Sequence, residues 1–241
     1  LQRRQRGIKT LVTLRCRRCR VTRLNIAVID FETTGLTPPV CAVEFAYVRI
    51  NEQMEVLDEY VTLVNPGRPI EPGAIGVHGI TDEEVADAIT IEQAIAPLQD
   101  LPCVLIAHNL PFDLRIAGPH LDVAGEVCTL ALSRQYVTGA ANHKLTTIRD
   151  HLGLPDFAAH RALGDAHTSL NILRRILNDH GLTLDQVIKR QSKPRMLSLM
   201  PFGKYGGRPV ADVPRDYRQW LLNAGNLDKD LEYTLRKLES L

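Results

Sequence analysis

The sequence lacks several features that would place it in a membrane, secreted or zinc-binding class. No apolar run approaches the roughly 20 residues that cross a bilayer, and no apolar core with a small-residue cleavage site marks a secretory signal. Cys16 and Cys19 have the spacing of half a zinc site, but no second cysteine or histidine pair completes it. The other cysteines lie in apolar segments, as buried reduced thiols do: Cys41, Cys103 and Cys128. We therefore expect a cytoplasmic protein without a membrane partner.

Four carboxylates and one histidine stand at the edges of apolar segments that are far apart in the sequence. They are Asp30 and Glu32 in VIDFETTGL, Asp113 in AHNLPFD, and His160 with Asp165 in HRALGD. The apolar run LNIAVIDF, residues 24–31, predicts a strand that ends at the turn residues TTG. Because successive strand side chains point to opposite faces, Asp30 and Glu32 share one face. Two such charges repel each other unless a cation lies between them.

A fold that gathers the four carboxylates would build a site for hard divalent cations. Carboxylate oxygens favour Mg²⁺ or Mn²⁺ over zinc or iron. Two-metal sites hold their ions roughly 3.5 to 4 Å apart and serve in-line displacement at phosphorus. His160 would act as the general base toward the attacking water, because imidazole titrates near neutral pH. The residues predict phosphodiester hydrolysis with two Mg²⁺ ions, for which Mn²⁺ could substitute.

The three segments resemble the motifs of the DEDDh 3′-to-5′ exonucleases, a family that includes polymerase proofreading subunits. The spacing of His160 and Asp165 matches the histidine subclass, whereas the tyrosine subclass has Tyr at the position of Arg161. Taken singly, each motif has a structural explanation, such as stabilisation of a helix start by Asp113. Their order and spacing together favour catalysis. By this resemblance the metal ligands are Asp30, Glu32, Asp113 and Asp165, and the base is His160.

Residues beside the motifs are candidates for substrate binding: Thr33, Thr34, Gly35, His78, His108 and Asn109. Gly35 would let backbone amides approach a sugar or phosphate closely. His78 lies in GAIGVHGIT, residues 73–81, which resembles a stretch that the family places near the terminal nucleotide, but His78 could equally cap a turn. His108 and Asn109 could bind substrate or orient the loop before Asp113.

Strand signals alternate with helical ones along the chain. Strands are expected at residues 24–31, 42–50, 59–64 and 104–107, and helices at residues 90–98, 146–151 and 161–178. This order predicts an α/β fold with a mixed sheet flanked by helices. The resemblance implies the same class, the ribonuclease H-like architecture. We expect a disordered basic extension at residues 1–23, the exonuclease domain at 24–181, a linker at 182–196 and a small α+β module at 197–241.

The net charge of +1 hides an uneven distribution. Residues 1–23 contribute +9, residues 24–180 contribute −12 and residues 181–241 contribute +4. Because an acidic body attracts a polyanion poorly, another part of the chain would have to help hold nucleic acid.

The C-terminal module is the candidate for that part. Its segment MPFGKYGGRPVADVPRDYRQWL, residues 200–221, interleaves aromatic and basic residues. Aromatic faces stack on unpaired bases while cations follow phosphates, so Lys204 and Tyr205 are candidate substrate contacts. Trp220 is expected to be buried in the core of the module. The segment also resembles the C-terminal element of the exodeoxyribonuclease X group within the family, which favours DNA as the substrate.

Together these features predict a metal-dependent 3′-to-5′ exodeoxyribonuclease that releases 5′-mononucleotides from DNA 3′ ends, single-stranded or in frayed duplex. The polarity and the product follow from the resemblance. Two alternatives of the same class are a proofreading subunit bound to a polymerase and an exonuclease that trims RNA 3′ ends. An inactive nucleic-acid-binding protein would have lost at least one of the five catalytic residues, and all five are present. RNA is a second possible substrate, and the sequence does not identify a protein partner.

Overall fold

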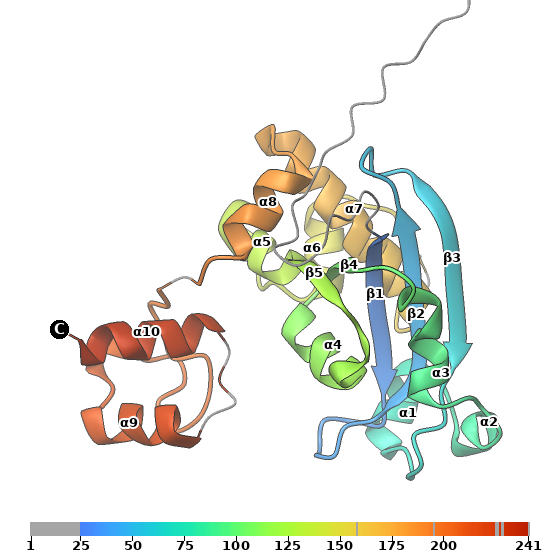
Figure 1. The fold of residues 1–241 in the computed structure, drawn as a ribbon, viewed down its shortest axis with the longest axis horizontal. Coiled ribbons are helices and arrows are strands. Elements are labelled where there is room, and N and C mark those ends of the chain that lie inside the picture. The colour runs from blue at the N-terminus through green and yellow to red at the C-terminus, as the bar shows by residue number, and fades with distance from the viewer. Residues whose placement is uncertain (1–24, 158, 195, 225–226, 228, 241) are drawn as a thin grey trace, which may run out of the picture. The chain divides into compact units, whose positions relative to one another are not determined.

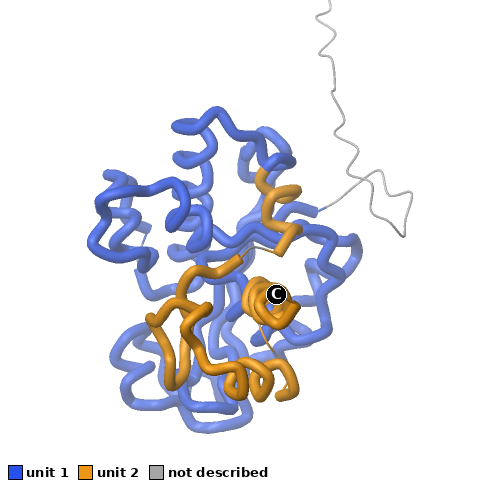
Figure 2. The backbone as a smooth tube through the Cα atoms, turned by 90° about the vertical axis from the view of Figure 1, so that its left-hand side faces the viewer, with its two compact units in different colours: residues 1–186 blue, residues 187–241 orange. Residues whose placement is uncertain are grey.

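The computed structural model describes residues 25–157, 159–194, 196–224, 227 and 229–240. The predicted basic extension, with Cys16 and Cys19, lies outside these residues. The chain divides into two compact units, with the boundary between Gln186 and Val187 (Figure 2). None of the described helices combines the length and the apolar character that spanning a membrane requires.

A five-stranded mixed sheet forms the centre of the first unit (Figure 1). Its strands are β1 (Asn25–Thr33), β2 (Ala42–Ile50), β3 (Val56–Leu63), β4 (Cys103–Ala107) and β5 (Val123–Cys128). They lie side by side in the order β3-β2-β1-β4-β5. β2 is antiparallel to β1 and β3, whereas β4 is parallel to β1 and β5. The predicted mixed sheet flanked by helices is confirmed.

Helices pack on both faces of this sheet. α7 (Ala162–His180) packs on β1 and β2, and α5 (Thr129–Tyr136) and α6 (Leu145–His151) pack on α7. The opposite face is covered by α3 (Ile91–Ile95), η1 (Ala96–Leu98) and α4 (Leu110–Ala117), whose apolar residues join one core cluster with β1 and β2. The short helices α1 (Pro72–His78) and α2 (Asp82–Val85) follow β3 and pack their own small core beside β2.

The alternation of β1 decides which face receives the acidic residues. Ala27, Ile29 and Phe31 point into the core shared with α3 and α4. The residues between them point the other way, toward the face on which α7 packs. Asp30 and Glu32 therefore emerge on the α7 face, at the carboxyl end of β1. Because β1 and β4 are parallel, the segment after β4 reaches the same edge of the sheet.

The second unit is helical. α9 (Arg215–Ala224), α10 (Lys229–Glu239) and the 3₁₀ turn η3 (Val210–Asp212) surround a small core of Met200, Val210, Val213, Leu221, Leu231 and Leu235. An α+β module was predicted here, but β pairing among its described residues is limited to one bridge between Leu199 and Pro209. Helix α8 (Leu184–Gln191) occupies half of the range predicted as a linker and extends across the unit boundary.

Candidate active site

The structure brings three of the four predicted metal ligands into one cluster. Carboxylate oxygens of Asp30, Glu32 and Asp165 lie within 4.8 Å of one another. Asp30 and Glu32 come from the end of β1, and Asp165 comes from the first turn of α7. The opposing residue of Asp30 on β2 is Ala46, whose small side chain leaves room for the carboxylate. Residues 135 positions apart therefore share one acidic site.

Asp113, the fourth predicted ligand, lies in the first turn of α4, directly after β4. Its side chain is buried, and its Oδ2 has no hydrogen-bond partner among the described residues. A buried carboxylate oxygen without a partner is energetically unfavourable, so its presence needs a reason. Asp113 is also close enough to Asp30 for its charge to raise the pKa of that carboxyl.

All four carboxyl groups have raised pKa values. Burial raises the pKa of Asp30 well above its usual range, and the neighbouring acidic residues raise it further. The pKa of Glu32 rises to about 7, first through burial and then through Asp165 and Glu44. Burial also raises the pKa values of Asp113 and Asp165. The site therefore gathers more acidic groups than the basic side chains around it can neutralise.

These observations fit divalent cations. The donors are carboxylate oxygens, the ligands that Mg²⁺ and Mn²⁺ prefer. A cation beside them would satisfy the free oxygen of Asp113 and reverse the mutual repulsion of the cluster. A metal site is therefore consistent with the side chains that are present.

His160 lies immediately before α7, in a left-handed backbone conformation with φ of 64°. Its side chain is exposed, as a group that meets substrate requires. Both its ring and a hydrogen bond from its backbone lower the pKa of Asp165, so the two residues are neighbours in space. The five residues of the three motifs thus meet at one edge of the sheet.

A family model described as an exonuclease, RNase_T, matches residues 27–173 and so contains all five of these residues. The chain belongs to this exonuclease family. The prediction of a 3′-to-5′ exonuclease is thereby confirmed. A second family model, named for a quorum-sensing-regulated virulence factor, matches residues 194–238.

Relatives of known name agree with this family. Exodeoxyribonuclease 10 of Escherichia coli (strain K12) is 33% identical over 222 residues, which covers 88% of this chain and 97% of that protein. A DNA polymerase III subunit epsilon-like protein of Rhodobacter capsulatus is 38% identical over 170 residues, covering 64% of this chain but only 24% of that protein. The first match is long enough to include residues of both units.

Solved structures share the fold. Exonuclease X in complex with 5′ overhanging duplex DNA superposes with a TM-score of 0.58 at 30% identity, covering 68% of this chain and 98% of that one. Exonuclease I gives a TM-score of 0.56 at 16% identity, covering 72% of this chain and 44% of that one. The second likeness supports the fold alone.

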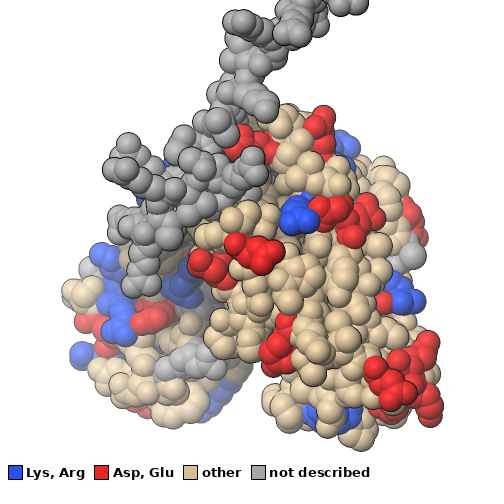
Figure 3. Space-filling model, turned by 45° about the vertical axis from the view of Figure 1, so that its right-hand side comes forward, with Lys and Arg blue, Asp and Glu red and all other residues tan. Residues whose placement is uncertain are grey.

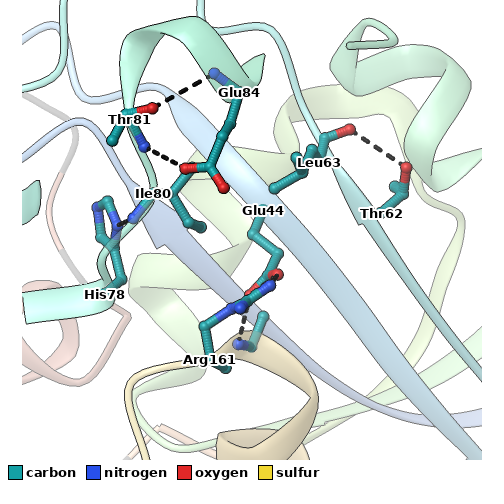
Figure 4. A network of polar contacts seen from close by, with 9 residues as sticks. Glu44, Thr62, Leu63, His78, Ile80, Thr81, Glu84 and Arg161 are labelled. Carbon is teal, nitrogen blue, oxygen red and sulfur yellow. Dashed lines mark hydrogen bonds and ion pairs between the residues drawn. The ribbon is translucent and has the colours of Figure 1, made fainter.

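One acidic residue of the exonuclease site was missed by the sequence reasoning. Glu44 lies on β2 directly opposite Glu32, and its side chain is only 1% exposed. Arg161 donates from Nε and Nη2 to the Glu44 carboxylate, and the backbone amide of Ala162 donates to the same carboxylate at 2.8 Å (Figure 4). A signal was present in the sequence, since Glu44 is the one acidic residue within the apolar strand AVEFAYVRI.

His78 connects two segments of the exonuclease rather than projecting into solvent. It is buried, and its Nδ1 accepts from the backbone amide of Ile80 at 3.0 Å (Figure 4). Its Nε2 lies 3.2 Å from the carbonyl of Thr33. Since Nδ1 accepts a hydrogen bond, Nε2 carries the proton and donates to the carbonyl of Thr33. Burial lowers the pKa of His78, which keeps the ring neutral. Its contacts hold the end of α1 against the end of β1, beside Glu32.

His108 is also committed to the fold of the exonuclease. Its Nδ1 lies 3.0 Å from the hydroxyl of Thr129, and its Nε2 lies 2.8 Å from the carbonyl of His143. Burial lowers the pKa of His108 to about 4. Asn109, the next residue, is exposed and left-handed, with φ of 79°, at the start of α4. Of the two, Asn109 has the side chain that remains accessible to substrate.

The residues after Glu32 form a tight turn. Thr34 is buried, and its hydroxyl accepts from the amide of Cys41 at 3.2 Å. Gly35 has φ of 141°, and a Cβ there would lie 2.2 Å from the Glu71 carboxylate. Thr33 donates its hydroxyl to the carbonyl of Gly35 at 3.3 Å. Only glycine fits this position, so Gly35 shapes the loop that borders the site.

Two predicted substrate contacts, Lys204 and Tyr205, belong to the second unit. Trp220 of that unit was expected to be buried, but it is 59% exposed. The reason is that the core of the unit is filled by aliphatic side chains from α9, α10 and η3. Of the three cysteines predicted to be buried, Cys103 is buried, whereas Cys41 and Cys128 are partly exposed.

Proposed function

We propose that this exonuclease removes nucleotides one at a time from DNA 3′ ends and releases 5′-mononucleotides. The observation that supports this most is the convergence of Asp30, Glu32 and Asp165 within 4.8 Å, near Asp113, whose Oδ2 has no hydrogen-bond partner among the described residues. Within the part of the chain that the structure describes, the groups that meet in this cluster are all carboxylates, which suits the chemistry of phosphoryl transfer.

In this proposal, Asp30, Glu32, Asp113 and Asp165 hold two Mg²⁺ ions. When bound, the ions supply Lewis-acid stabilisation of the charge that develops on the attacking and leaving oxygens. The carboxylates define where the scissile phosphate rests, because their positions on β1, α4 and α7 are fixed by the sheet and its helices. The raised pKa values give each of them a strong preference for a cation over an unpaired charge.

His160 takes the proton from the attacking water. It is exposed at the mouth of the site and adjacent to Asp165, so it can reach a water molecule that approaches the phosphate. The imidazolium that would form lies beside the carboxyl group of Asp165. The Glu44–Arg161 contact fixes the chain on the C-terminal side of His160 while the proton moves.

The choice of DNA is supported by the extent of the similarity. The match to Exodeoxyribonuclease 10 covers 97% of that protein and runs into the second unit. The epsilon-like protein is matched over only 24% of its length, as is expected for an exonuclease domain within a longer chain. A proofreading subunit remains the second candidate function, because that relative is the more identical over the region that it shares.

One experiment tests the polarity, the sugar and the metal together. The full chain is incubated with 3′- or 5′-labelled single-stranded DNA, duplex DNA and RNA, with Mg²⁺, Mn²⁺ or EDTA. We expect early release of a labelled mononucleotide from 3′-labelled DNA, a ladder from 5′-labelled DNA, and no product in EDTA. Faster cleavage of RNA than of DNA would contradict the DNA assignment, and activity in EDTA would contradict the metal site.

A matched pair of variants links the activity to the cluster. Asp165→Asn keeps the size and shape of the side chain but removes its charge, and we expect it to abolish cleavage. Asp100→Asn makes the same change on an exposed residue of the same unit and is expected to leave cleavage unchanged. Substantial Mg²⁺-dependent activity in Asp165→Asn would refute the ligand assignment.

A further inference from the structure

Three aromatic side chains of the second unit form a continuous row. The ring centroids of Tyr205 and Tyr217 are 4.9 Å apart, and those of Tyr217 and Trp220 are 5.4 Å apart. Tyr217 and Trp220 are three residues apart on α9, so their side chains are neighbours on one face of the helix. Tyr205 precedes the helix on a glycine-rich loop. We call these three residues the aromatic row.

The aromatic row is not required to fill the core of its unit. The buried core consists of one methionine and of valine and leucine side chains. Tyr205 and Tyr217 pack against this core and are themselves partly buried, whereas Trp220 is 59% exposed. A large aromatic side chain left in solvent exposes apolar area at a cost of about 25 cal/mol per Å². Such exposure is expected where a ligand covers the ring.

Two cations border the row. The Nζ of Lys204 lies 5.4 Å from the centroid of Tyr205, and the guanidinium carbon of Arg208 lies 5.9 Å from it. Both side chains are exposed, and neither pairs with a carboxylate among the described residues. Arg215 and Arg218 differ from them, because both are engaged by Glu239. Of the basic residues beside the row that the structure describes, Lys204 and Arg208 are therefore free to meet an anionic ligand.

The distribution of charge indicates the class of that ligand. Residues 181–241 have a net charge of +4 and residues 24–180 one of −12. Acidic side chains lie in several groups over the face of the molecule that Figure 3 shows. A polyanionic substrate must be attracted by something other than the acidic unit. Aromatic faces beside unpaired cations are the surface on which single strands bind, with bases stacked on rings and phosphates beside cations.

We propose that the aromatic row, with Lys204 and Arg208, is a binding site for an unpaired nucleic acid strand. A base stacks on the exposed face of Trp220, and phosphates lie against Lys204 and Arg208. The site has no sequence preference, since every base has a face that can stack. The identity of the occupant rests on the proposed function, which makes nucleic acid the substrate of the same chain.

Trp220 is the only tryptophan of the chain, so its fluorescence reports on the row directly. The full chain is titrated with unlabelled oligo-dT in EDTA, which prevents cleavage, while the fluorescence emission of Trp220 is followed. A labelled oligo-dT of the same length gives the affinity by anisotropy. We expect the emission to be quenched along the same binding curve, because stacking brings a base onto the indole. Binding by anisotropy without any change in emission overturns the proposal.

Variants of the row, compared with matched variants elsewhere in the unit, distinguish loss of this binding site from a general loss of aromatic or basic groups. Trp220→Leu is expected to weaken binding about tenfold, in the range for loss of one stacked base. Lys204→Ala and Arg208→Ala should each lower the salt dependence of binding by about 0.7 in the log–log slope, the value for one phosphate contact on a single strand. Tyr233 and Lys237 form an aromatic–cation pair elsewhere, on α10, with 5.8 Å between Nζ and the ring centroid. Tyr233→Leu and Lys237→Ala are the matched controls, and an equal loss in them counts against the row.

The result is distinguishable from failure of the proposed function. Asp30→Asn, which is expected to be inactive, should still show the quenching of Trp220 by oligo-dT. Quenching that rises with protein concentration in the absence of DNA would instead make the row an interface between two copies of the chain, and would overturn the proposal. Cleavage of DNA together with unquenched Trp220 would refute the row and leave the active site intact.

Discussion

Glu32 and Glu44 occupy directly opposing positions on the antiparallel strands β1 and β2. Like charges at such positions destabilise a sheet. Arg161 offsets this repulsion, because its guanidinium binds the Glu44 carboxylate from the start of α7 (Figure 4). The contact joins β2, which pairs with the strand that carries Asp30 and Glu32, to the segment with His160 and Asp165. One ion pair therefore offsets the charge of Glu44 and fixes the segment that carries His160 and Asp165.

Glu44→Gln should impair catalysis more than it impairs folding. The glutamine keeps its shape and one acceptor for the Ala162 amide but loses the charge that holds Arg161. We expect a stability loss of about 1.5 to 3 kcal/mol, the range for a hydrogen bond to a charged group, and a lower kcat with KM little changed. Urea unfolding and steady-state kinetics on one oligonucleotide measure the two effects.

The control for this ion pair lies on the same strand. Arg49 of β2 binds Asp58 of β3 in a similar two-pronged geometry, with Nη2 at 2.7 Å, but outside the site. Asp58→Asn should leave kcat unchanged. If Glu44→Gln retained full kcat, Glu44 would have a structural role only.

His108 should contribute to the loss of stability in acid. Its pKa is about 4 in the folded protein because of burial, against about 6.5 in the unfolded chain. The unfolded chain therefore binds the proton first, and stability falls as the pH decreases from about 6.5 toward about 4. His108→Gln should flatten the stability curve in this window. The free energy of unfolding in urea between pH 4 and pH 8 tests this.

The same variant tests whether His108 contacts substrate. If His108 acts through its bonds to Thr129 and His143, the variant loses stability while KM for DNA stays within about twofold at a temperature where it is folded. A large rise in KM without loss of stability would restore His108 as a substrate contact.

Much of the first unit follows from local sequence. Strand β2 was predicted with the bounds that the structure shows, because its apolar run is long and β-branched. Strand β5 was missed, since VAGEVC is short and has glycine and a charge in its middle. The α+β prediction for the second unit failed to anticipate α10, whose amphipathic pattern begins after a short loop. Short or interrupted hydrophobic patterns such as these do not identify a strand or a helix from the sequence alone.

The motifs indicated residues that the structure brings together, but not the contacts that hold them in place. Each motif is a short contiguous segment, so it can be recognised from the local sequence alone. The contact between Glu44 and Arg161 joins positions 117 residues apart, and no local pattern connects them. His78 and His108 show the same limit, because the partners of their ring nitrogens come from other segments. The exposure of Trp220 depended on which residues fill a small core, which only the packing reveals.

Asp30→Asn should stabilise the metal-free protein. In the folded state the pKa of Asp30 is raised well above its usual range and that of Glu32 to about 7. Because the unfolded chain releases these protons earlier, the folded state loses stability as the pH rises from about 4 to about 7. Removing the charge of Asp30 should raise the free energy of unfolding at high pH by about 1 kcal/mol or more. This corresponds to a rise in Tm of about 2 to 4 °C for a chain of this size. Thermal unfolding in EDTA at pH 8 measures it.

Added Mg²⁺ should make the wild-type chain more stable than Asp30→Asn. The wild-type chain gains stability from any ion that binds only the folded state, whereas Asp30→Asn has lost a ligand and should gain less. A wild-type Tm that is the same in EDTA and in Mg²⁺ would argue against a cation at this cluster.

Replacement of His160 should slow the chemical step while the metal ligands stay in place. His160 has φ of 64°, a conformation that asparagine and glycine adopt with little strain, so His160→Asn and His160→Gly are better tests than alanine. The hydrogen bond to Asp165 comes from the backbone and survives both changes. We expect single-turnover cleavage to fall by about 10² to 10⁴ with little change in the Mn²⁺ affinity, as for loss of a general base. His151→Asn, on an exposed residue of α6, should cleave normally, and an unchanged rate in both His160 variants would mean that another group accepts the proton.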